Sequence, residues 1–248
     1  MAIAFDAVST AAMAWGGTST TLSHTITGTN PGIIVWCPTG TTTSPITDVT
    51  WNGVSLGAAV LSYRENGGGG YDFYHSLYYA QNVTTGTHDV VVTRTASGGD
   101  LVVLSYTGLG SVEHTAHGNN TAATITSTNT TTNAAAILFA IFGPTGSGGG
   151  SGMSAGTGCT AIRTNYVNNV ISSPGDSVGI SLTPGSNTMT GNRVSGNAFN
   201  WWAGVAFAPY SAPAGPANLK SYNTNLKANI KSIDTNLIAN IKSLDTNV

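Results

Sequence analysis

Over residues 1–211, apolar residues either alternate with polar residues or gather in short runs, and both patterns are typical of β-strands. Glycine, proline, asparagine and serine separate these stretches, as expected of turns. Asn52-Gly53 stands between two of them and predicts a hairpin with a type I′ turn. The whole pattern predicts an all-β head, a jelly-roll-like β-sandwich. The expected strands are residues 2–8, 21–26, 33–37, 47–51, 54–61, 71–81, 87–94, 101–107, 123–127, 135–142, 159–167, 177–182, 187–190 and 201–208.

Residues 219–248 follow a different rule, because their large apolar residues recur every three or four positions within a repeat of eleven residues. On an α-helix this spacing makes one narrow apolar stripe. A repeat of eleven residues has about 3.67 residues per turn and predicts a right-handed coiled coil. We therefore expect an α-helical oligomerisation stalk, joined to the head by the Pro-rich linker 212–218. The stripe consists of Leu219, Tyr222, Leu226, Ile230, Ile233, Leu237, Ile241, Leu244 and Val248.

Two alternatives for these repeats stay open, a disordered linker and a β-solenoid. Asparagine, serine, threonine and aspartate fill most of the outward positions, and all are poor helix formers. The stripe nevertheless continues through every expected position, which a disordered segment has no reason to do. Isoleucine and leucine are mixed along it without strict alternation, and this does not favour a two-stranded coiled coil.

Charged residues make up only 7% of the chain, which argues against an ordinary cytosolic α/β enzyme and favours a secreted or virion β-protein. The head has four arginines against eight acidic residues, and neither it nor the tail has a basic patch suited to nucleic acid. No segment reaches the roughly 18 apolar residues of a membrane span. The N-terminus lacks the basic segment of a secretory signal, so we expect a phage protein released by lysis or a chain whose leader was removed. The expected location is extracellular, on a virion or a cell surface.

Four segments carry a resemblance to a known family: ITDVTWNGVSL (46–56), HSLYYAQNVTTGTHDVVVT (75–93), LVVLSYTGL (101–109) and WWAGVAFAP (201–209). Their order resembles a β-sandwich domain that recurs in bacterial surface proteins and phage-related proteins. The tail resembles the Asn/Thr-rich stalk repeats of phage tail fibres and trimeric adhesins. The second resemblance implies a homotrimer. Neither supplies a catalytic, cofactor-binding or metal-binding residue.

The most polar and aromatic stretch of the head surrounds a run of four glycines at residues 67–70. Aromatic rings stack on the apolar faces of sugars, while amides and charged groups bind sugar hydroxyls. Arg64, Asn66, Tyr71 and Asp72 are therefore candidate contacts for a cell-surface glycan. The alternative is that the aromatic residues of this stretch pack in the core of the sandwich.

The two cysteines, Cys37 and Cys159, are too few for a disulfide scaffold and lack the partner ligands of a zinc site. One interpretation is that both are small buried apolar residues. The other is a single disulfide bridge between distant strands, which would stabilise the fold without taking part in function.

Motifs that could carry catalysis lack their usual surroundings. The segment GMSAG (152–156) matches the nucleophile elbow of hydrolases, but it lies in a glycine-rich stretch with no helix after it. His114 and His117 stand beside Glu113 in what reads as a loop, and their spacing does not argue for a metal. A glycosidase needs two carboxylates about 5–10 Å apart, and the head offers only Glu65, Glu113 and six aspartates for such a pair.

The sequence thus predicts a non-enzymatic structural or adhesive fibre protein, with a β-sandwich head on an oligomeric stalk. The alternative is a carbohydrate-binding module that the stalk makes multivalent, because weak single sites gain avidity when they are linked.

Overall fold

The computed structural model describes residues 3–41, 43–66, 72–95, 97–133, 136–145, 153–155, 160–163, 175–182, 184–193 and 199–211. Met1–Tyr210 form one compact unit, separate from Ser211–Val248. The predicted linker 212–218 and stalk 219–248 lie outside the described residues, so the coiled coil stays a prediction. The described residues form seventeen β-strands and no helix, which confirms the all-β prediction. They therefore contain no helix that is long and apolar enough to cross a membrane.

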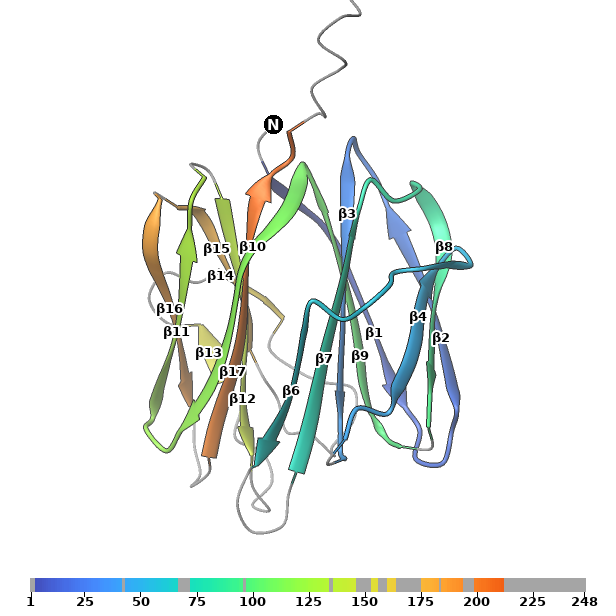
Figure 1. Ribbon diagram of the computed structural model, residues 1–248, viewed down its shortest axis with the longest axis horizontal. Coiled ribbons are helices and arrows are strands. Elements are labelled where there is room, and N and C mark those ends of the chain that lie inside the picture. The colour runs from blue at the N-terminus through green and yellow to red at the C-terminus, as the bar shows by residue number, and fades with distance from the viewer. Residues whose placement is uncertain are drawn as a thin grey trace, which may run out of the picture. The chain divides into compact units, whose positions relative to one another are not determined.

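The first half of the head is a sandwich of two antiparallel sheets (Figure 1). Its five-stranded sheet, here called the first inner sheet, has the order β1-β9-β3-β7-β6. Its four-stranded sheet, the first outer sheet, has the order β2-β8-β4-β5. The strands are β1 (Ala4–Met13), β2 (Ser19–Ile26), β3 (Pro31–Thr39), β4 (Ile46–Trp51), β5 (Val54–Ser55), β6 (Leu61–Asn66), β7 (Asp72–Gln81), β8 (Gly86–Arg94) and β9 (Gly99–Thr107).

The second half is another sandwich of two antiparallel sheets. The second inner sheet has the order β10-β17-β12-β15-β14, and the second outer sheet has the order β11-β16-β13. The strands are β10 (Leu109–Asn120), β11 (Thr124–Thr131), β12 (Ala136–Thr145), β13 (Met153–Ala155), β14 (Thr160–Arg163), β15 (Gly175–Leu182), β16 (Gly185–Arg193) and β17 (Phe199–Pro209).

The two sandwiches share one topology. When β1–β4 are matched with β10–β13 and β6–β9 with β14–β17, the strand orders of the two inner sheets coincide. The orders of the outer sheets coincide as well, except that β5 has no counterpart among the described residues. In each sandwich the first strand pairs with the last and the second with the next to last, the connectivity expected of a jelly roll. The head that the sequence predicts as one sandwich is therefore a tandem of two.

The strands β8 and β16 match at the level of single residues. Each has nine residues, begins with a glycine and ends with an arginine. The glycines, Gly86 and Gly185, have φ values of 110° and 129°, which a residue with a side chain rarely adopts. Four residues further on, Val90 and Met189 are both buried. The same turn geometry and the same buried position thus recur in both halves.

A buried polar residue also recurs at equivalent positions of β2 and β11. The ring of His24 makes hydrogen bonds to the hydroxyls of Ser9 (2.8 Å) and Ser105 (3.1 Å) on the first inner sheet. Asn129 makes a hydrogen bond of 3.1 Å to the ring of His114 on the second inner sheet. Ser9 lies on β1 and His114 on its counterpart β10, so each sandwich joins its outer sheet to its inner sheet in a similar way.

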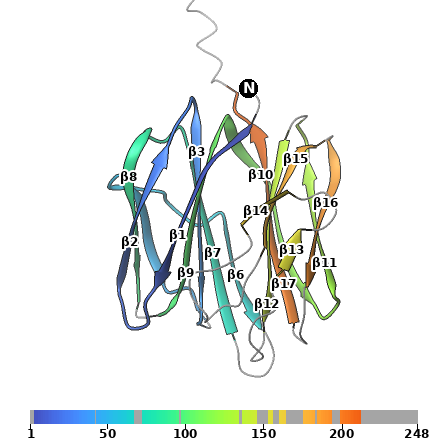
Figure 2. The same cartoon turned by 180° about the vertical axis from the view of Figure 1, so that it is seen from behind.

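The four sheets are stacked in the order outer, inner, inner, outer, as Figures 1 and 2 show from opposite sides. One apolar core, with Met13, Val35 and Trp51, lies between the first outer and first inner sheets. A second core lies between the two inner sheets, and its largest side chains include Trp36 and Trp201. The two sandwiches are therefore joined by a core that they share.

Burial on both faces explains the sequence of the central strands. Every residue of β3 is buried, and so are all residues of β9 except the last. Strands covered on both faces read as continuous apolar runs, which here are IIVW (33–36) and LVVL (101–104). By contrast, burial alternates residue by residue along β11, which has one face on the second inner sheet and one face open.

The structure confirms the turn predicted at Asn52-Gly53 and corrects two other expectations. Asn52 and Gly53 have φ values of 49° and 75°, both positive as a type I′ turn requires. The predicted strand 54–61 is wrong, because β5 ends at Ser55 and Gly57 turns the chain with a φ of 79°. The loop expected around residues 113–117 is strand β10, whose polar residues meet polar partners on both faces.

Candidate functional site

The β6–β7 hairpin holds the residues that the sequence predicts as glycan contacts. Arg64 is exposed on β6 and lies opposite Tyr74 of β7. Asn66 lies opposite Asp72 in the same register, so the hairpin brings three of the four predicted residues to one end of the first inner sheet. Tyr71 lies outside the described residues.

Hydroxyl groups surround the described part of this hairpin. The hydroxyl of Ser62 donates to that of Tyr74 at 3.1 Å, and the hydroxyl of Thr39 donates to the Tyr74 carbonyl at 3.2 Å. Ser44 and Ser76 are in hydrogen-bond contact at 3.5 Å. Thr39 and Ser76 are buried. The groups open to a ligand are therefore the guanidinium of Arg64, the phenol of Tyr74 and the hydroxyl of Ser62. Such groups can bind a hydroxylated ligand, so this surface is the first candidate site.

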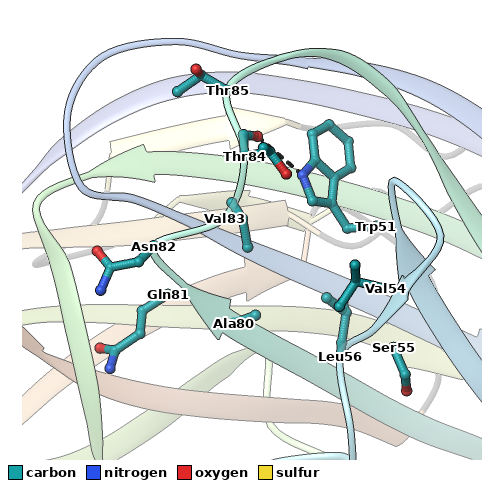
Figure 3. A pocket seen from close by; sticks show the side chains of 10 residues that line it. All are labelled: Trp51, Val54, Ser55, Leu56, Ala80, Gln81, Asn82, Val83, Thr84 and Thr85. Carbon is teal, nitrogen blue, oxygen red and sulfur yellow. Dashed lines mark hydrogen bonds between the residues drawn. The ribbon is translucent and has the colours of Figure 1, made fainter.

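A second candidate is an open pocket of about 620 Å³ in the first sandwich (Figure 3). This volume falls in the range of pockets that bind small molecules. The indole N–H of Trp51 donates to the carbonyl of Thr84 at 3.1 Å and joins the two turns that form the pocket. Its lining is uncharged and consists of Trp51, Val54, Ser55, Leu56, Ala80, Gln81, Asn82, Val83, Thr84 and Thr85.

Sequence reasoning missed this pocket because its two walls are distant along the chain. One wall follows the turn at Asn52-Gly53, and the other is the connection between β7 and β8. The first turn is visible in the sequence, but its contact with residues 80–85 depends on the pairing of β4 with β8. A long-range pairing of this kind leaves no local signal.

Between the two inner sheets lies a cluster of aromatic and polar side chains. The ring of His75 stacks on that of Tyr63, with centroids 4.9 Å apart, and lies 4.2 Å from the ring of Trp201. Tyr63 also stacks on His117, with centroids 4.0 Å apart. Burial, with a smaller effect from His117, lowers the pKa of His75 to about 3. His75 is therefore neutral at pH 7 and acts there as a packing residue.

The two glutamates do not form the carboxylate pair of a glycosidase. Glu65 accepts a hydrogen bond of 2.5 Å from Asn119, and burial raises its pKa. Burial also acts to raise the pKa of Glu113, but hydrogen bonds from Thr132 and Asn133 outweigh it and lower that pKa. Asn119 and Glu113 are six residues apart on β10, roughly 20 Å along a strand. A glycosidase needs about 5–10 Å.

His114 and His117 contact different sheets. His114 makes its hydrogen bond to Asn129 of the second outer sheet, whereas His117 stacks on Tyr63 of the first inner sheet. The two rings therefore cannot share a metal ion. In the part of the chain that the structure describes, no group of three or more metal-ligating side chains occurs.

Cys37 is a buried free cysteine in the core of the first sandwich, and burial raises the pKa of its thiol to about 12. Its predicted bridge partner, Cys159, lies outside the described residues, so the bridge stays a prediction. We expect native protein at pH 8 to leave Cys37 unmodified by iodoacetamide, because the thiolate is the reactive form. Labelling should require unfolding, as intact-mass measurement would show. Rapid labelling of Cys37 in the native protein would contradict this burial.

Comparison with known proteins gives no lead: no protein-family model, no curated protein and no solved structure matches this chain.

Proposed function

We propose that the protein is a non-enzymatic structural or adhesive fibre protein of a virion or bacterial surface, with a double-sandwich head carried by an oligomeric stalk. The observation that carries this proposal is the core shared by the two inner sheets. Neither sandwich can move away from the other without exposing residues such as Trp36 and Trp201, so the head is a single stiff body. A stiff head with few charges suits display at the end of a fibre.

The oligomeric stalk can be tested directly, through the mass of the assembled protein. The stripe from Leu219 to Val248 would be exposed in a monomer, and burying one such side chain contributes roughly 1.5–3 kcal/mol. An isolated helix of this length is marginal in water, so association must supply its order. We expect multi-angle light scattering of the full chain to give the mass of a trimer. A monomer at micromolar concentration would contradict the stalk, and a stable dimer or tetramer would contradict the stoichiometry.

A pair of substitutions separates the stalk from the head as the source of assembly. Ile233→Asp together with Leu237→Asp places two charges in the apolar stripe and should yield folded, monomeric heads. Ser232→Asp together with Asn236→Asp adds the same charges next to the stripe and should leave the oligomer intact. Oligomers that survive the first pair would mean that the heads hold the assembly together.

A carbohydrate-binding module made multivalent by the stalk is the second candidate function. It is favoured by the hydroxyl-rich β6–β7 hairpin, where exposed Arg64 lies opposite Tyr74 and Asn66 opposite Asp72. Binding of the full chain to a glycan array, lost in Arg64→Ala and Asp72→Ala variants, would support this site. Trimeric protein that binds no glycan on the array would leave a purely structural role.

A further inference from the structure

Trp15 stands apart from the buried tryptophans of the head. Trp36, Trp51 and Trp201 are at most 2% exposed, whereas Trp15 is 56% exposed. It lies in the turn between β1 and β2, where the N–H of Gly17 donates to the carbonyl of Ala14 at 3.1 Å. Gly16 follows with a φ of 78°, so the turn is of type II, with Trp15 at its second position. The sequence places a large apolar ring at the tip of a tight turn.

The inner face of this ring rests on Gly98. A Cβ atom at residue 98 would lie 2.7 Å from Cδ2, Cε2 and Nε1 of Trp15, so the indole lies flat over the glycine. Gly98 itself is buried, in the connection between β8 and β9. Only a residue without a side chain permits this contact, and the outer part of the indole is left to solvent.

A single buried arginine ties together the two turns that position the ring. The Nη2 of Arg94 donates to the carbonyl of Ala14, next to Trp15, at 3.1 Å. Its Nε donates to the carbonyl of Ser97, next to Gly98, at 3.0 Å. Its Nη1 donates to the hydroxyl of Thr20 at 2.7 Å. Arg94 as a whole is 3% exposed, so its bonds hold a frame rather than offer a charge to a ligand.

The second sandwich has an arginine at the position of Arg94 but no aromatic residue in the turn that corresponds to that of Trp15. Its β16 also ends in an arginine, Arg193, the counterpart of Arg94. Its turn between β10 and β11 consists of Thr121, Ala122 and Ala123, all exposed and none aromatic. An exposed indole is therefore no requirement of this fold, and Trp15 is a particular feature of the first sandwich.

We propose that Trp15 is the stacking platform of a carbohydrate-binding site that takes a neutral pyranose, and this inference rests on the proposed adhesive function. A flat aromatic face of about the size of a sugar ring, fixed before the ligand arrives, costs little entropy on binding. The described residues of the turns around the ring (14–19, 40–41, 43–45, 95 and 97–98) include no charged residue, and many of them are threonine or serine. The N–H of Gly40 donates to the carbonyl of Gly98 at 3.1 Å and brings the second of these turns to the platform. Neutral hydroxyls around an aromatic face suit a neutral sugar better than an anionic one.

The test uses the full chain on an array of neutral hexopyranose oligosaccharides and sialylated glycans, followed by titration calorimetry with the best soluble neutral oligosaccharide. We expect binding to a neutral glycan, and a loss of at least about tenfold in affinity for Trp15→Ala, because stacking is the main contact. Gly98→Ala keeps the indole of Trp15 but displaces it, because the added Cβ would overlap the ring. This variant should weaken binding with little effect on the thermal midpoint. Phe5→Ala is the matched control, because it removes another exposed aromatic ring, 46% exposed on β1, and should bind like the unchanged protein.

Several results would overturn the inference. They are full binding by Trp15→Ala, a loss of binding in the control Phe5→Ala, selective binding of sialylated glycans, and no binding to any neutral glycan. Adhesion of the labelled chain to whole bacterial cells separates this failure from failure of the proposed function. If cells are bound without any glycan on the array, the adhesive function stands and the platform falls. If neither is bound, the platform and the adhesive role both fail, and a purely structural role is left.

Discussion

Replacing Trp201 by alanine is expected to lower the free energy of unfolding by about 3–5 kcal/mol, the usual cost of removing a large aromatic side chain from a core. Trp201 is fully buried between the two inner sheets. Its ring centroid lies 5.7 Å from that of Trp36 and 4.2 Å from that of His75, both on the opposite sheet. The substitution opens a cavity in the core that joins the two sandwiches. Urea unfolding followed by circular dichroism measures the loss.

The next residue along the strand supplies a matched control. Trp202 is only partly buried and points away from the shared core, so that its indole lies beside Gly118. Trp202→Ala removes the same number of atoms and should cost clearly less than Trp201→Ala, because partly exposed side chains leave less of a cavity. Equal losses in the two variants would mean that the shared core is not a main source of stability.

The shared core also predicts how the head unfolds. Because residues such as Trp36 and Trp201 belong to one cluster, loss of either sandwich exposes the inner sheet of the other. We therefore expect one cooperative transition for the unchanged head, and the same transition at lower urea for Trp201→Ala. Two separate transitions in the unchanged protein would show that the sandwiches are independent domains.

Local pattern predicted most of the strands, but it missed β6, β10 and β13 and did not predict the duplication of the sandwich. The runs IIVW and LVVL mark β3 and β9 because these strands are covered on both faces. The strand β11 gives a weak signal because three of its inward residues are Ser127, Asn129 and Thr131, which a hydrophobic pattern counts as exposed. Its polar inward face is possible because Gly204 on the facing strand leaves room: a Cβ there would lie within 2.5 Å of Ser127 Oγ.

The candidate sites show the same difference between local pattern and long-range contacts. The hairpin residues Arg64, Asn66 and Asp72 are close in sequence, so composition alone could single them out. Sequence reasoning missed Trp15, because its position depends on residues about 80 positions along the chain: Gly98, which its ring covers, and Arg94, which donates to the carbonyl of Ala14. A buried and an exposed tryptophan look alike in a sequence. The one local hint was the Gly-Gly pair that follows Trp15, which marks a tight turn.

Acidification is expected to destabilise the head strongly, and His75 is expected to be a main cause. His75 is 1% exposed, and neither ring nitrogen has a hydrogen-bond partner among the described residues. Burial lowers its pKa to about 3, while a histidine in the unfolded chain has a pKa of about 6.5. Between these two values the unfolded state binds the extra proton, so stability falls as the pH falls. One such group contributes up to about 1.4 kcal/mol per pH unit in that window.

Other groups titrate in the same experiment with known signs. Burial lowers the pKa of His24 and His117, so both act in the same direction as His75. Hydrogen bonds lower the pKa of Asp6 against the effect of burial, so its contribution to stability is lost at lower pH, below the unfolded value near 4. Burial raises the pKa of Glu65, which acts in the opposite direction because the folded state takes up its proton first. The pH dependence of the unfolding free energy of the unchanged protein alone therefore does not isolate the contribution of His75.

A comparison of two variants isolates the contribution of His75 to the pH dependence of stability. His75→Phe keeps a planar ring against Tyr63 and Trp201 but removes the titrating group. Its stability relative to the unchanged protein should rise by about 2.3 kcal/mol between pH 6.5 and pH 4.5, whatever constant cost the larger ring has at neutral pH. Tyr63→Phe perturbs the same cluster, since it removes the hydroxyl that donates to the Trp202 carbonyl at 3.3 Å, but it leaves His75 in place. That variant should lower stability by a constant amount and keep the full dependence on pH.

The measurement is urea unfolding of each variant at a fixed protein concentration from pH 7 to pH 4, because association through the tail would otherwise change the apparent stability. If His75→Phe and the unchanged protein lose stability in parallel, the proton that unfolds the head binds elsewhere, and His24 or His117 becomes the first residue to replace. If the slope disappears in His75→Phe and persists in Tyr63→Phe, the neutral imidazole between the two inner sheets is the group whose protonation the fold cannot accommodate.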